Sequence, residues 1–272
     1  MFRRGQTGQA MVESAIVFPL LVFFVMGILQ LTLIQQSRLM LEYAAFNAAR
    51  AGSVWNGDPK KMEDAAIISL LPTMPSVPGD MVPLRVDEPA LLAARWGIVQ
   101  LANKLGGGIK AKMIEVETLN PTAADFQNSP EIEFDMVDPG LDGTSTLEER
   151  RPSQLTIRLT YFYYLRLPII NKFMFETWLA GMGGLGLRGL DPFRPKIAGM
   201  PGGGGGLGSR MVIEALKAKT NCPFSGITRT TLLGLIALGQ ASGKYYMPMV
   251  TTYTIRMQSN FFKRYLTKNK SC

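Results

Sequence analysis

Histidine is absent from the 272 residues of this chain. Its absence removes the commonest general base, the commonest metal ligand and every Ser-His or Cys-His catalytic pair. Cysteine is scarce too, because Cys222 and Cys272 alone cannot build a four-ligand zinc site. The two thiols could form one disulfide if the C-terminal part lies outside the cytoplasm. The composition argues against an enzyme and predicts no metal or cofactor. A membrane-tethered hydrolase would need a pair of carboxylates in a cleft.

Charge is also scarce. Charged residues make up 18% of the chain, below the ~25% of an average soluble protein. The shortage is concentrated between Glu13 and Arg38, because the run Ser14–Ser37 contains no charged residue. About 20 apolar residues are enough to cross the hydrocarbon core of a bilayer, so this run predicts one transmembrane helix. Arg3 and Arg4 precede it, and the positive-inside rule then leaves the N-terminus in the cytoplasm and the bulk of the chain outside.

The positive charges are spread along the chain. Although the net charge is +8, the basic residues do not gather into one stripe, and no nucleic-acid partner is predicted. The C-terminal tail is basic, which is typical of a solvated end, and contact with anionic lipid or an acidic partner is the alternative. Its basic residues are Lys263, Arg264, Lys268 and Lys270.

Two simple interpretations of the N-terminal segment fall short. A cleaved secretory signal has an apolar core of 7–15 residues followed closely by a small-x-small site. Here the apolar run is much longer, and the nearest such triplet, Ala49-Arg50-Ala51, lies too far along. A plain membrane anchor fits the run but does not explain Glu13, a carboxylate that costs roughly 1–3 kcal/mol at a membrane-helix end unless it finds water or a partner.

The pattern around Glu13 resembles a known family. The stretch "GQAMVESAIVFPLLVFFVMGILQL" and the later "LEYAAFNAARAGSV" look like the TadE-like family of tight-adherence (type IVc-like) pilus assembly proteins, which are minor pseudopilins. The family opens with G-x-A-x-V-E, continues with an apolar helix containing proline, and then has an alanine-rich stretch ending in AAR-x-G. The matching residues here are Gly8, Ala10, Val12, Glu13, Pro19 and 48–52.

The resemblance implies a processing site and an assembly role. A prepilin peptidase would cut between Gly8 and Gln9, which makes Glu13 the fifth residue of the mature chain, whereas a cut after Gly5 would place Ala10 there. Glu13 would then pair with the freed amine of an adjacent subunit, because two charges in lipid are less costly together than apart. Pro19 and Gly27 are two points where the membrane helix could bend, although plain tolerance of both is the alternative.

The implied protein is a minor pilin of a bacterial tight-adherence pilus. It would sit in the inner membrane as a single-pass protein with an extracytoplasmic domain, and it could be incorporated into the pilus. Its expected partners are the bilayer, the prepilin peptidase, the major pilin, other minor pilins and the inner-membrane assembly platform. The alternative is an uncleaved single-pass scaffold of a pilus or secretion machine that never enters a fibre.

The rest of the chain predicts an α+β fold, in which the long N-terminal helix precedes a pilin-like domain. Alanines near residues 44–52 share one helix face and predict close packing, more simply within the domain than against neighbouring helices. Alternating patterns predict an antiparallel sheet of about four strands, at 110–119, 131–137, 154–167 and 249–259. The expected divisions are a leader (1–8), a transmembrane helix (9–37), its extracytoplasmic continuation (38–55), and a domain (56–272) with a Gly-rich insertion at about 176–245.

Overall fold

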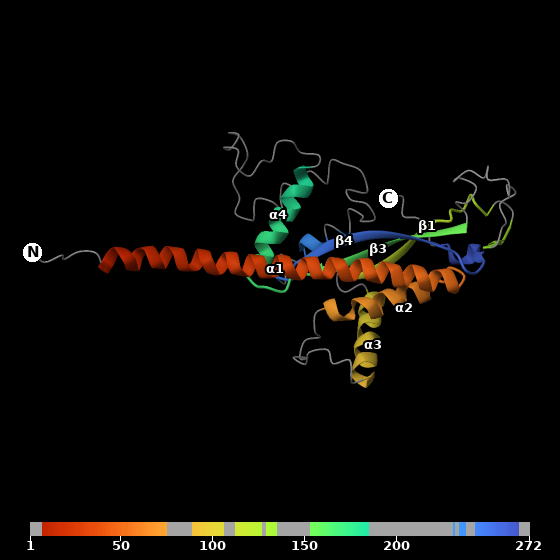
Figure 1. Cartoon of the computed structure of the whole chain (residues 1–272), viewed down its shortest axis with the longest axis horizontal. Helices are drawn as coiled ribbons and strands as arrows, with labels where there is room; N and C mark the ends of the chain where they lie inside the picture. The colour runs from red at the N-terminus through yellow and green to blue at the C-terminus, as the bar shows by residue number, and fades with distance from the viewer. Residues whose placement is uncertain are drawn as a thin grey trace, which may run out of the picture.

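The computed structural model describes residues 7–74, 89–105, 112–126, 129–134, 153–184, 231, 234–237 and 243–266. Its first helix, α1 (Thr7–Val54), is a long rod whose N-terminal part projects beyond a mixed domain (Figure 1). The predicted α+β fold is confirmed. The other elements are α2 (Pro59–Leu70), η1 (Leu71–Thr73), α3 (Pro89–Leu105), β1 (Ile114–Asn120), β2 (Glu131–Ile132), β3 (Gln154–Tyr164), α4 (Ile170–Gly184), β4 (Tyr246–Arg256), β5 (Phe261–Phe262) and η4 (Lys263–Tyr265).

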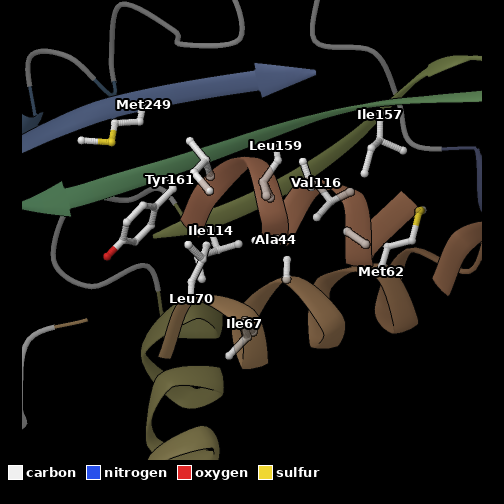
Figure 2. Packing of buried hydrophobic residues seen from close by; sticks show 14 of the residues in the cluster. Ala44, Met62, Ile67, Leu70, Ile114, Val116, Ile157, Leu159, Tyr161 and Met249 are labelled. Carbon is white, nitrogen blue, oxygen red and sulfur yellow. The ribbon is translucent and has the colours of Figure 1, made fainter. Parts of the chain in front are cut away.

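The main sheet is antiparallel, with β3 between β1 and β4. Along β3, the side chains of Leu155, Ile157, Leu159 and Tyr161 alternate onto one face and are fully buried, which confirms the alternation expected there. The cross-strand register places Val116 of β1 opposite Leu159, so the two strands share this face. Figure 2 shows the side chains of Val116, Ile157, Leu159 and Tyr161 pointing from the sheet toward α1 and α2.

The main sheet has three strands, where the sequence predicted about four. The segment expected at 131–137 contributes β2, which pairs with β5 in a separate two-stranded sheet. Ile132 and Phe261 are both buried, and the Phe261 ring lies 5.9 Å from that of Phe126. The apolar pattern of this segment therefore reflects packing at the end of the domain rather than membership of the main sheet.

Small residues let α1 approach α2 and the sheet closely. Ala44, Ala45, Ala48 and Ala49 are buried in the core cluster, which confirms that the alanine-rich face packs within the domain. At Gly52 an added Cβ would lie 2.5 Å from the Met62 sulfur and 2.7 Å from a Leu155 methyl group. Any larger side chain there would have to displace the buried side chains of Met62 and Leu155. The C-terminal part of α1 is thus an integral helix of the domain.

A tight turn ends α1 and starts α2. Asn56 and Gly57 have φ of 57° and 78°, a left-handed conformation that glycine and asparagine accept most readily. Asp58 then caps α2, because its carboxylate oxygen Oδ1 accepts the backbone N–H of Lys60 at 2.9 Å. A Cβ on Gly57 would overlap the buried ring of Phe261, so this turn also holds the β5 end of the domain against α1.

Some predicted features lie outside the described residues. Both Cys222 and Cys272 do, so their disulfide stays a prediction. Most of the Gly-rich insertion expected at about 176–245 does as well. The described parts of that range are the end of α4, residues 231 and 234–237, and the approach to β4; of these, Leu235 and Ile236 are buried.

Candidate assembly site on the N-terminal helix

The predicted cleavage bond lies in the first turn of α1. This helix begins at Thr7, so Gly8 and Gln9 already have helical backbone. Gln9 and Glu13 are four residues apart, which places them on the same face of the helix about 6 Å apart along its axis. An amine created at Gln9 would therefore begin one helical turn before the carboxylate of Glu13.

Glu13 is an exposed carboxylate within an apolar surface. Its neighbours Met11, Val12 and Ile16 are large, apolar and exposed. Within the described part of the chain Glu13 forms no ion pair; the pairs found there join Arg38 to Glu42, Lys112 to Glu63 and Arg158 to Glu117. A carboxylate presented in this way is suited to pairing with a cation from outside its own helix.

Pro19 lies inside α1 and does not interrupt it. The α1 helix runs through it without a break, although proline supplies no backbone N–H at that position. A shallow depression surrounds it on the helix surface, lined by Met11, Ser14, Ala15, Phe18 and Pro19. The depression lies next to Glu13 in sequence, so the segment presents a charge and a hollow within two turns of helix.

The first half of α1 is exposed apolar surface. Among the described residues, α1 is the helix long and apolar enough to cross a membrane, and 6% of its most apolar 18-residue window is buried. The exposed side chains include Phe18, Leu21, Phe24 and Ile28. Such a surface matches a lipid environment better than water.

The domain nevertheless contacts one stripe of this apolar segment, which the sequence analysis did not anticipate. The side chain of Gln30 is fully buried, and its oxygen Oε1 accepts the backbone N–H of Leu167 at 3.0 Å. In the sequence, this contact could have been indicated by a polar residue, Gln30, in a seam of positions that follow one another at intervals of four and three residues within the apolar run. That seam, partly or fully buried, comprises Phe23, Gly27, Gln30, Ile34, Ser37 and Leu41.

Gly27 lies where the domain comes near the helix. A Cβ added to Gly27 would be 3.7 Å from Cδ1 of Ile170, the first residue of α4, which is an ordinary van der Waals distance. One turn earlier, the rings of Phe23 and Phe173 meet edge to face with their centroids 5.3 Å apart. The region around Gly27 is therefore a contact between α1 and α4.

The long exposed apolar helix that leads into the α+β domain has the length and composition of a membrane anchor. Residues 8–50 match the model of a family described as TadE-like protein, which agrees with the resemblance found in the sequence. This segment carries Gly8, Glu13, Pro19 and the alanines of the domain core, and it links the chain to tight-adherence pili. No curated protein and no solved structure matches the chain.

Proposed function

We propose that this chain is a minor pilin or pseudopilin that takes part in assembling a tight-adherence pilus after cleavage between Gly8 and Gln9. The observation that carries the proposal is the spacing from Gly8 to Glu13 at the start of a lipid-compatible helix whose segment 8–50 is TadE-like. The protein would be anchored in the bacterial inner membrane by a single helix, with its N-terminus in the cytoplasm and its domain outside.

Cleavage would change the electrostatics of the helix start. It removes Arg3 and Arg4 and creates a positive amine at Gln9, while Glu13 keeps its carboxylate. In an assembly, the amine of one subunit would neutralise Glu13 of the next, so neither charge would stay unpaired in lipid. The exposed position of Glu13 supports this role, because the carboxylate is open to an intermolecular partner.

The rigid connection between anchor and domain suits a mechanical component. The α1 helix continues without interruption from the proposed assembly site to the alanine face buried in the domain. Force applied at Glu13 would therefore reach the domain through one helix. The partners of such a component are the prepilin peptidase, the major pilin, other minor pilins and the inner-membrane assembly platform.

Mass spectrometry of the purified protein's N-terminus tests the cleavage. In cells that hold the peptidase, we expect the mature chain to begin at Gln9. Gly8→Val should leave the precursor intact, because a branched side chain replaces hydrogen beside the bond to be cut. Gly5→Val is the matched control and should still be processed. Wild-type protein that keeps Met1, or equal blockage by both variants, would refute cleavage after Gly8.

An uncleaved membrane scaffold is the second candidate. The observation that favours it is that the bond between Gly8 and Gln9 lies within the first turn of α1 rather than in extended chain. An intact Met1 end on protein that co-purifies with the assembly platform, but not with sheared pili, would establish this alternative.

A further inference from the structure

The helix α4 packs beside the part of α1 that is predicted to span the membrane. Two contacts join them, the Phe23 and Phe173 rings and the approach of Ile170 to Gly27. A third, the hydrogen bond from Leu167 to Gln30, joins α1 to the segment that leads into α4. In Figure 1, α4 starts at the middle of α1 and runs away across its direction rather than along it. Because α4 runs across the direction of α1, α4 cannot also lie along the bilayer normal when α1 spans the membrane.

The contact points fall within the expected thickness of the bilayer. With a rise of about 1.5 Å per residue, a hydrocarbon core of about 30 Å occupies roughly 20 residues of helix. Measured from Glu13, the core would extend to about residue 33 and would include Phe23, Gly27 and Gln30. Even if the core began at Thr7, it would reach about residue 27 and still include the first two. A tilted helix would need more residues to cross, so tilt would extend the core further along α1.

The start of α4 exposes apolar side chains where lipid would be. Ile169 is 72% exposed and Phe173 is 53% exposed. Ile169 also has a φ of 70°, which is unfavourable for a β-branched residue. At a position exposed to water, glycine or asparagine would be expected with this backbone conformation. An apolar environment gives a reason for isoleucine at this strained and exposed position, since its side chain gains from leaving water.

The polar residues near the start of α4 lie along one edge of the helix. Lys172 is exposed and Glu176 is half-exposed, and their four-residue spacing places them on one edge of the helix. Phe173 follows Lys172 and lies on the neighbouring edge, and Ile169 lies in the left-handed turn just before the helix. This arrangement turns the apolar edge to lipid, while Lys172 can extend its ammonium group toward the headgroups.

From these observations we infer that the start of α4 is a second membrane contact, with Ile169 and Phe173 inserted into the outer leaflet beside α1. The occupant of this apolar surface is the lipid bilayer. The inference rests on the proposed function to the extent that α1 must span the membrane. It adds that the domain is fixed against the membrane surface while the protein is anchored there.

Spin labelling of the full-length protein in phospholipid nanodiscs tests the inference. Both native cysteines are first replaced by serine (Cys222→Ser and Cys272→Ser), and single labels are attached through Ile169→Cys and Phe173→Cys. Collisions with molecular oxygen, which concentrates in lipid, are compared with collisions with a water-soluble nickel chelate. We expect an oxygen-to-nickel accessibility ratio at both sites that is several-fold higher than at a site in water.

Two control sites separate failure of the inference from failure of the anchor. Phe24→Cys reports the exposed mid-span surface of α1, and Leu39→Cys reports exposed α1 surface beyond the uncharged run. The inference is overturned, and the anchor stands, if the label at Phe24 has the high oxygen-to-nickel ratio of lipid while the ratios at Ile169 and Phe173 both equal that at Leu39. If the ratio at Phe24 also equals that at Leu39, then α1 does not span the membrane, and the inference is refuted together with the anchor. Labels at Ile169 and Phe173 that are immobilised and shielded from both reagents would indicate a protein occupant, which also overturns it.

Discussion

The buried side chain of Gln30 should hold the domain against the membrane helix. Replacing it by Gln30→Leu keeps a similar volume but removes the acceptor of the Leu167 N–H, which lies 3.0 Å from Oε1. The Leu167 N–H is only partly buried, and the change also removes the buried Nε2 of Gln30, which has no partner, so the net cost is at most that of one ordinary hydrogen bond, about 0.5–1.5 kcal/mol. Each 1.4 kcal/mol is a factor of ten in an equilibrium, so the cost corresponds to an increase of roughly 2-fold to 10-fold in opening of the contact between α1 and the segment that leads into α4.

Hydrogen–deuterium exchange of the full-length protein in nanodiscs measures this opening. We expect amides of the segment 165–173 to exchange faster in Gln30→Leu by a factor within that range, while amides of β3 stay protected. The matched control is Gln35→Leu, which makes the same chemical change at an exposed position of α1 five residues later. Equal exchange of segment 165–173 in the two variants would refute the argument that Gln30 fixes the domain to the span.

Three further predictions follow from the turn, the core and the assembly site. Gly57→Ala should lower the free energy of unfolding by about 3 kcal/mol or more, because it adds a clash with Phe261 to the strain of a left-handed backbone. The control Gly243→Ala, with φ of 66° and open space around it, should lower it by only about 1 kcal/mol. Equal losses of stability in thermal unfolding would contradict this. Burial raises the pKa of the Tyr161 hydroxyl above its ordinary value of about 10, so the unfolded chain ionises first and stability should fall as pH rises above about 10; Tyr161→Phe should reduce that slope in alkaline denaturation, and an unchanged slope would show that another group is responsible. Glu13→Ala should insert into the membrane normally but should be depleted from sheared pili, and wild-type incorporation would exclude Glu13 as the assembly carboxylate.

Glu13 is singled out both by the family resemblance and by the cost of a carboxylate at the start of an apolar helix. Composition alone identifies an uncharged run and a carboxylate at its start, and both are local features that do not depend on folding. The family match at residues 8–50 covers both Gly8 and Glu13, and so gives a meaning to the spacing of five residues between them.

The sequence by itself determined the features that arise from neighbouring residues. Among them are the apolar run of α1, the Asp58 cap of α2, and the alternation of β3, because helix caps and strand periodicity depend on nearby residues along the chain. The close packing of the alanine face could also be predicted, since small side chains on one helix face permit close approach whatever element covers them.

Only the tertiary structure decided which distant segments meet. The strand expected at 131–137 joined β5 rather than the main sheet, because an alternating pattern indicates a strand but does not select its partner. Likewise, Gln30 resembled any polar residue of a membrane helix until the fold brought Leu167, 137 positions away, to its side chain. Long-range contacts of this kind depend on the packing of the whole domain, and they place α4 beside the span.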